Sequence, residues 1–267
     1  MPPFPAVILK VLQLLNDPNA SPDAIQKKIL LDPSLTSLFL KVANSALYAV
    51  SNEVTTIHYA IRLIGYDTAR MLLMAYMSKK IFSYGSSMIK GVLWKHAVSS
   101  AIFAQKIAEK HRQVNLEEAF IAALLHDIGK GVLLKNKPHE YEKITEIVTN
   151  ENKLSVDVEQ DALGFSHIEV GYLLMKKWNF PERIVEALIH HHDAMEYSGD
   201  NVLVPITSLA NKLSHLNNYN FNKWFEGWEQ DIPELKILAI TEDELHVLSE
   251  KAIKEIEETL AVFEKIT

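Results

Sequence analysis

Histidine and aspartate recur at four places in the middle of this chain. They are His96, the adjacent pair His126 and Asp127, His167, and the run His190-His191-His192-Asp193. The chain has no cysteine, so a metal ion would have to be held by imidazole and carboxylate groups, the natural ligands for Zn, Mn or Fe. An aspartate that bridges two ions is a common device for activating water. The pattern indicates a candidate site centred on Asp127.

The stretch "EEAFIAALLHDIGKGVLLK", residues 117–135, is predicted as one apolar helix that contains His126, Asp127 and Lys130. Burial without a partner raises a carboxyl pKa by about 3–5 units, and each unit is worth about 1.4 kcal/mol. On one helix His126 and Asp127 point about 100° apart, and Lys130 follows His126 by one turn. We therefore expect all three to reach one opening, where Asp127 meets a metal, a base or water.

The other clusters are weaker on their own. Neighbours in the run 190–192 diverge by about 100° on a helix, so two can point inward and one outward. The same run can instead be a helix end that turns into a loop. His96 alone, on an amphipathic helix, would more often be structural. The four clusters in this order carry the argument together.

Apolar residues at helical spacing run through most of the chain, and strand alternation and internal repeats are absent. Helix starts are predicted at Ser21-Pro22, Asp32-Pro33, Asn115 and Thr241, and a break at Gly65. The sequence therefore predicts an all-α protein with two helical lobes. Residues 218–240 are irregular and aromatic. Their Trp224, Phe225 and Trp228 either close the core between the lobes or form a partner surface.

Composition excludes several classes of function. The 267 residues carry a net charge of −7, so nucleic-acid binding is not expected. Only 9 residues are glycine, without a Gly-rich phosphate loop, which opposes a Rossmann or P-loop nucleotide site. We find no signal peptide and no run of the ~20 apolar residues that a membrane span needs. A cytoplasmic protein that does not bind membranes is expected.

Several motifs resemble a known family. "LLHDIGK", with the upstream histidine of "LWKHAVSSA", resembles the HD phosphohydrolase superfamily. "PPFPAVILKVLQLLNDPNAS", "LDPSLTSLFLKVANSALY", "TIHYAIRLIGYDTAR" and "FSHIEVGYLLMKKWNFPERIVEALIHHHD" resemble HDOD domains, the HD-related output domains, over residues 1–215. The tail "LAITEDELHVLSEKAIKEIEETL" is also typical of them. The family is a bacterial, all-helical signalling module related to the HD-GYP cyclic di-GMP phosphodiesterases, and most members have no demonstrated catalysis.

The resemblance implies a role for each candidate residue. Asp127 would bridge the metals, Lys130 would face a phosphate, and His190 would be spare. The implied metal ligands are His96, His126, Asp127, His167, His191, His192 and, in the last ligand position, Asn211. The implied cofactor is one or two divalent ions of Fe, Mn, Zn or Ni.

Two departures from the HD-superfamily pattern matter. Asn211, in "SLANKL", stands where an aspartate is usual, so one metal position offers a carbonyl oxygen without a charge and should bind more weakly. The segment "HHDAMEYSGDNV" lacks the GYP loop, which opposes cyclic-dinucleotide recognition of the HD-GYP kind. Without a metal, the same imidazoles and carboxylate can form a satisfied polar network.

The expected organisation has three parts. Residues 1–88 form the first helical lobe of an HDOD domain, and residues 89–215 form an HD-like lobe with the histidine cluster. Residues 216–267 form an extension whose last helix packs on the lobes. The polar stretch 83–90 is the best candidate boundary.

Two functions remain open at this point. In the first, which we favour, the chain is a bacterial signal-transduction output or regulatory module with a partly degenerate HD site and a signalling protein partner. In the second it is a metal-dependent phosphohydrolase that acts on a nucleotide or other phosphate ester, with Asp127 and Lys130 as catalytic residues.

Overall fold

The computed structural model of the chain describes residues 4–45, 47–48, 50, 52–84, 87–220 and 232–264. These residues form helices joined by turns, and no strand occurs among them, so the all-α prediction is confirmed. The chain divides into two compact units, residues 3–77 with 254–267, and residues 78–253. The predicted boundaries at 88 and 215 stay predictions. Trp224, Phe225 and Trp228 lie outside the described residues.

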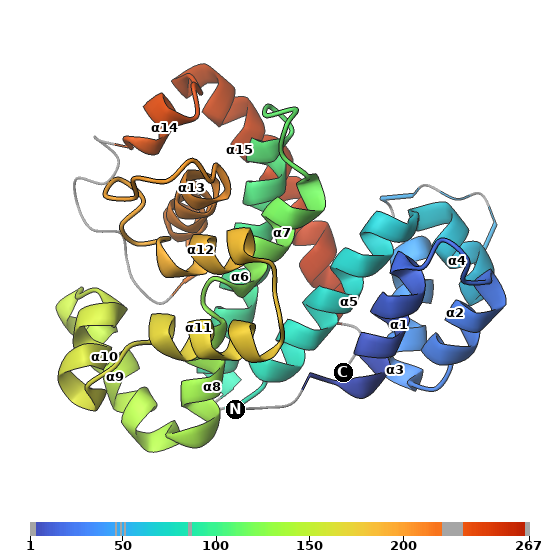
Figure 1. Cartoon of the computed structure of the whole chain (residues 1–267), viewed down its shortest axis with the longest axis horizontal. Helices are drawn as coiled ribbons and strands as arrows, with labels where there is room; N and C mark the ends of the chain where they lie inside the picture. The colour runs from blue at the N-terminus through green and yellow to red at the C-terminus, as the bar shows by residue number, and fades with distance from the viewer. Residues whose placement is uncertain are drawn as a thin grey trace. The chain divides into compact units, whose positions relative to one another are not determined.

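The first unit is built from short amphipathic helices. Its elements are α1 (Ala6–Asn16), α2 (Pro22–Ile29), α3 (Pro33–Ala43), α4 (Ile57–Ile64) and most of α5 (Tyr66–Ile81), as Figure 1 shows. The Ser21 hydroxyl accepts the N–H of Ala24, and the Asp32 carboxylate accepts the N–H of Leu35. The predicted starts of α2 and α3 are therefore confirmed. Gly65, at φ 83°, separates α4 from α5.

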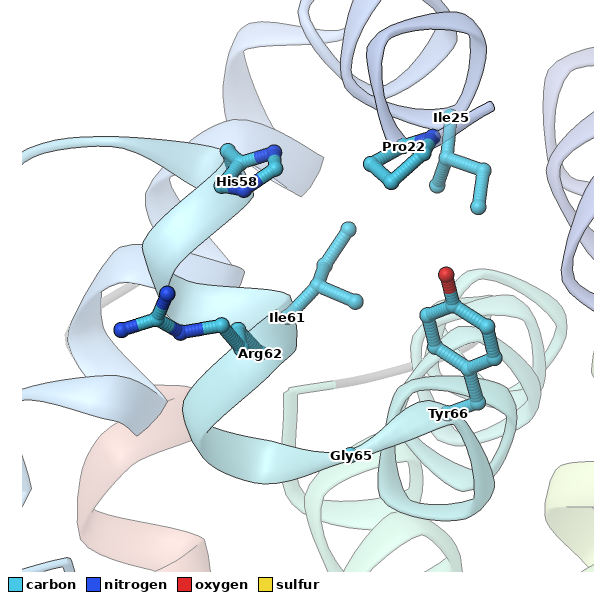
Figure 2. Close-up of a pocket in the computed structure, with 7 residues that line it drawn as sticks. All are labelled: Pro22, Ile25, His58, Ile61, Arg62, Gly65 and Tyr66. Atoms are coloured by element: carbon cyan, nitrogen blue, oxygen red, sulfur yellow. The ribbon is translucent and has the colours of Figure 1, made fainter. Parts of the chain in front are cut away.

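A cavity of about 300 Å³ opens in this unit. Its lining consists of Pro22, Ile25, His58, Ile61, Arg62, Gly65 and Tyr66. Figure 2 shows Ile61 and the ring of Tyr66 pointing toward Pro22 and Ile25, while Arg62 points away from them. The Arg62 guanidinium instead lies 5.4 Å from the centre of the Tyr59 ring. His58 and Arg62 are both exposed, so the walls of the cavity present no buried charge.

The second unit surrounds the long helix α6 (Ser87–Ala108), which packs against α7 (Leu116–Leu125) and α13 (Leu203–Leu216) (Figure 1). Buried Ala97, Ala101 and Ala104 of α6 are small, so these neighbours can approach closely. The remaining elements are α8 (Ile128–Asn136), α9 (Pro138–Glu151), α10 (Ser155–Leu163), α11 (His167–Lys177), α12 (Glu182–Ile189), α14 (Glu234–Ile237) and the first half of α15 (Glu242–Glu264), whose residues from 254 on belong to the first unit. Within the part of the chain that the structure describes, no helix is both long and apolar enough to span a membrane.

The chain around His126 and Asp127 differs from the prediction. The expectation of one helix through residues 117–135 is wrong, because α7 ends at Leu125 and α8 begins at Ile128. His126 and Asp127 form the turn between them, and the N–H of Lys130 donates to the carbonyl of Asp127 at 2.9 Å. The Asn115 side chain caps α7 as predicted, accepting from Glu117 and Glu118. The His-Asp pair therefore lies at a junction of two helices.

Two glycines let α8 and α11 touch along their backbones. A Cβ atom on Gly129 would lie 2.0 Å from the carbonyl oxygen of His167 and 2.9 Å from the nitrogen of Gly171. A Cβ on Gly171 would lie 2.9 Å from a Leu188 methyl group. No side chain fits between the two helices at Gly129. This contact places Asp127, two residues earlier, beside the first residue of α11.

We expect Gly129→Ala to destabilise the protein by about 1–3 kcal/mol or more, the usual cost of overpacking that forces the backbone to shift. The added methyl group meets main-chain atoms of His167, which cannot rotate away as a side chain can. Urea unfolding followed by circular dichroism measures the change.

Gly91→Ala is the matched control, because it lies inside α6 with no atom within 4 Å of the new Cβ. Alanine is the better helix former by about 1 kcal/mol, so this variant should be as stable as the parent or more so. Equal stability of the two variants would contradict the proposed backbone contact.

Candidate metal centre

The carboxylate of Asp127 lies among four histidines that come from four parts of the second unit. Its Oδ1 atom is 3.2 Å from Nε2 of His167 and 3.8 Å from Nε2 of His191. Its Oδ2 atom is 3.5 Å from Nε2 of both His96 and His126. Lys130 donates to the same Oδ2 atom at 2.8 Å. The two oxygens therefore face two different sets of neighbours.

Almost all of this cluster is removed from solvent. His96, His126 and His167 are fully buried, His191 and Asp127 are 1% and 2% exposed, and Lys130 is 7% exposed. His192 is exposed, and its ring centre lies 4.0 Å from that of His191. His190 turns elsewhere and places its ring 4.9 Å from that of Tyr197. Of the run 190–192, His191 and His192 thus lie at the cluster.

Two of the histidines are oriented by helix ends. His126 directly follows α7 and His191 lies two residues beyond α12, where the last carbonyls have no partner within the helix. Nδ1 of His126 lies 2.6 Å from the carbonyl of Ala123, and Nδ1 of His191 lies 2.7 Å from that of Leu188. A carbonyl can only accept, so Nδ1 carries the hydrogen in both rings. Nε2 is then the nitrogen of each ring that faces Asp127.

Two serine hydroxyls hold His96. Ser99 Oγ donates to the carbonyl of His96 at 3.0 Å and lies 2.5 Å from Ser214 Oγ. Ser214 Oγ lies 2.8 Å from Nδ1 of His96 and 3.4 Å from its carbonyl oxygen, so the serines contact both the ring and the backbone of His96. Nε2 of His96 lies 3.2 Å from Nε2 of His126, within hydrogen-bond distance.

His167 is held by two elements. It is the first residue of α11, where the Glu169 carboxylate accepts from both the backbone N–H and the hydroxyl of Ser166. Its Nδ1 lies 2.7 Å from Glu159, a buried carboxylate of α10. The Nε2 atom is thereby aimed at Asp127.

The electrostatics favour a charged Asp127 carboxylate beside neutral His96 and His191. Burial, reinforced by neighbouring cationic groups, lowers the pKa of His96 and His191 well below the ordinary value. Burial alone would raise the pKa of Asp127, but Lys130 and His126 hold it well below its usual range. Burial would lower the pKa of His167, but the Glu159 carboxylate outweighs burial and raises it.

The donor atoms fit a divalent cation. Among the described residues, two sets have ligand atoms within 4.8 Å of one another, Asp127 with His167, His191 and His192, and Asp127 with His96 and His126. Asp127 Oδ1, His167 Nε2, His191 Nε2 and Asn211 Oδ1 are buried without a hydrogen-bond partner in the described part of the chain. Buried polar atoms are rarely left so. A cation satisfies lone pairs for which no hydrogen is present, and imidazole and carboxylate suit first-row metals.

The structure thus brings together His96, His126, Asp127, Lys130, His167, His191 and His192 from the predicted set. Asn211 is buried on α13, three residues before the Ser214 that contacts His96. Its role as a ligand stays a prediction.

Three neighbours of the cluster were missed by sequence reasoning. Glu159 and Ser214 belong to no motif, and only the packing of α10 and α13 shows what they touch. His215 was assigned no role, yet its ring centre lies 4.9 Å from that of His96. Burial and Lys130 lower the pKa of His215 to about 3.

The described part of the chain is thus helical, with histidines and one aspartate buried around a helix junction. The family model for the HDOD domain matches residues 1–194. The chain therefore belongs to the HDOD domain family.

Known relatives share the fold at low sequence identity. An uncharacterised protein of Treponema pallidum (strain Nichols) is 25% identical over 194 residues, which are 72% of this chain and 38% of that protein. This chain therefore spans well under half of that relative. The crystal structure of an HDOD domain protein from Geobacter sulfurreducens matches 100% of this chain and 93% of its own with a TM-score of 0.82 at 24% identity. A Shewanella amazonensis SB2B structure, provisionally named a phosphohydrolase, matches 100% and 95% with a TM-score of 0.77 at 23% identity.

We expect the metal-free protein to lose stability as the pH falls below about 6.5, the ordinary pKa of histidine in the unfolded chain. In this range the unfolded chain binds protons that folded His96 and His191 do not bind. Between pH 6.5 and 5.5 each of these histidines lowers the free energy of unfolding by about 1 kcal/mol, and the slope approaches about 1.4 kcal/mol per pH unit at lower pH. The raised pKa of His167 has a different effect. It stabilises the folded chain below pH 6.5, and this stabilisation is lost as the pH rises above that value.

Urea unfolding at pH 6.5 and 5.5, with a chelator present, measures this slope. His246→Gln removes a histidine whose side chain is 76% exposed and should leave the slope unchanged. A free energy of unfolding that stays level between the two pH values would show that the buried rings are protonated in the folded state.

Proposed function

We propose that this chain is a regulatory module of HDOD type that holds a divalent metal at its buried centre and acts through a partner protein. The observation that carries the proposal is the burial of the donors. Of the set Asp127, His167, His191 and His192, only His192 is exposed. Structural metal sites are closed, whereas catalytic sites keep an open position for water or substrate. The closed site favours a structural or regulatory ion over turnover.

The two oxygens of Asp127 are not equivalent for an ion. Lys130 already supplies a positive charge to Oδ2 at 2.8 Å, on the side of His96 and His126. Oδ1, His167 Nε2 and His191 Nε2 have no such partner among the described groups. We therefore assign the stronger site to Oδ1 with His167, His191 and His192. The set of His96 and His126 would bind a second ion more weakly.

The second candidate is a metal-dependent phosphohydrolase. The two donor sets that share Asp127 favour it, because two-metal sites of this kind serve phosphate esters. A divalent ion would act as a Lewis acid on the phosphate. The ammonium of Lys130 would break its contact with Asp127 and bind a phosphate oxygen instead. Asp127 would orient the ions. The 7% exposure of Lys130 weighs against easy access for a nucleotide or other phosphate ester.

We expect the purified protein to contain about one divalent ion of Fe, Mn, Zn or Ni per chain, and Asp127→Asn to contain none. The substitution keeps the shape of the side chain but removes the charge that an ion needs. Elemental analysis measures the metal content. The variant His246→Gln, which changes an exposed histidine, is the control and should keep the metal content of the parent protein. The loaded protein should leave bis(p-nitrophenyl) phosphate and nucleotides intact.

The outcomes separate the two candidates. Turnover that is lost in both Asp127→Asn and Lys130→Ala would overturn the regulatory proposal and establish the phosphohydrolase. No metal in the parent protein would remove the metal from either proposal and leave a polar network.

The variant Asn211→Asp tests whether a carboxylate at position 211 strengthens metal binding. We expect it to destabilise the metal-free protein, because it buries a charge at a position 5% exposed. With Mn²⁺ added, the variant should bind at least tenfold more tightly than the parent and regain stability. Calorimetric titration with Mn²⁺ and urea unfolding check both parts. Equal affinity of variant and parent would show that Asn211 does not face the ion.

A further inference from the structure

A second buried carboxylate, Glu159 of α10, lies behind His167. It is fully buried and accepts three hydrogen bonds. Its Oε2 atom accepts from the backbone N–H of His167 at 2.6 Å and from Nδ1 of the same residue at 2.7 Å. Its Oε1 atom accepts from the hydroxyl of Tyr141 at 2.6 Å. The main chain and the ring of one candidate ligand are thus both fixed by one oxygen atom.

We propose that Glu159 is a positioning residue of the metal centre, which fixes the ring of His167 and supplies through it the negative charge that Asn211 does not provide. This inference rests on the proposed metal at the Oδ1 side of Asp127. A carboxylate behind a ligating imidazole fixes its tautomer and makes the ligand more basic. Glu159 stands in that relation to His167, whose Nε2 lies 3.2 Å from Asp127 Oδ1.

The charges at the centre support this assignment. Asp127 contributes one negative charge, and the ammonium of Lys130 on its Oδ2 atom cancels it. Imidazoles that bind an ion are neutral and add no charge, and Asn211 is uncharged. Without Glu159 the centre would present no net negative charge to a divalent ion. With Glu159 it presents one, in a buried site where charges are weakly screened.

The hydrogen bond from Tyr141 allows a metal-related role of Glu159 to be distinguished from a purely structural one. Tyr141 is buried and contacts the outer oxygen of Glu159, away from His167. If Glu159 only satisfied a polar network, removing either end of the network should have similar effects. If Glu159 serves the metal, only the loss of its charge should change metal affinity strongly.

The test compares Glu159→Gln with Tyr141→Phe in the full chain, with Zn²⁺ as the probe and a chromophoric chelator as competitor. We expect Glu159→Gln to weaken Zn²⁺ binding by about 10–100-fold, the usual effect of losing such a carboxylate. Tyr141→Phe keeps the charge and should stay within about threefold of the parent protein. Comparable losses in the two variants, or none in Glu159→Gln, would overturn the proposal.

Histidine side-chain nitrogen NMR adds a readout that does not need metal. In the metal-free parent at pH 8, Nδ1 of His167 should carry a hydrogen with a strongly downfield, slowly exchanging resonance, and in Glu159→Gln that resonance should move upfield. A bare Nδ1 in the parent would overturn the proposal even if Glu159→Gln does not fold.

The Zn²⁺ titrations also show which proposal is wrong. If the parent protein itself fails to bind Zn²⁺, the metal of the proposed function is ruled out. Normal binding by the parent with no effect of Glu159→Gln rejects the role of Glu159 alone.

Discussion

The burial of one negative charge, that of Asp127, governs the arrangement of the second unit. A carboxylate 2% exposed is unfavourable unless its surroundings stabilise it. Lys130 supplies one charged hydrogen bond, and four imidazoles surround the remaining lone pairs. The helices that carry these groups must therefore end, begin or cross at one point. The break between α7 and α8 and the start of α11 both occur there.

The orientation of the imidazoles comes from elements that have no chemistry of their own. Helix-end carbonyls hold His126 and His191, a pair of serines holds His96, and Glu159 holds His167. In each case Nδ1 is engaged and Nε2 faces Asp127. The donor set is therefore arranged by backbone geometry and buried polar groups before any ion binds. Such preorganisation reduces the ordering that ligand binding would otherwise require.

The sequence predicted which side chains gather at the centre better than the way they are held. Periodicity and caps at Ser21, Asp32, Asn115 and Thr241 correctly indicated helices, because these signals are local. The histidine clusters were recognised because residue type and order along the chain suffice to identify them. The break at His126 and Asp127 was missed because no glycine or proline marks it. Glu159 and Ser214 were missed because their roles depend on which helices pack together, which spacing along one segment cannot reveal.

The contact between Gly129 and the backbone of His167 has a mechanical consequence. Side chains can absorb a small displacement by changing rotamer, but two main chains in direct contact cannot. A displacement of Asp127, two residues away, would therefore meet the backbone of His167 and not a side chain that can yield. The same helix α11 carries Leu173, which is 55% exposed, so a shift of α11 would change the surface of the unit. The absence of a side chain at position 129 thus ties the start of α11 to the position of the buried carboxylate.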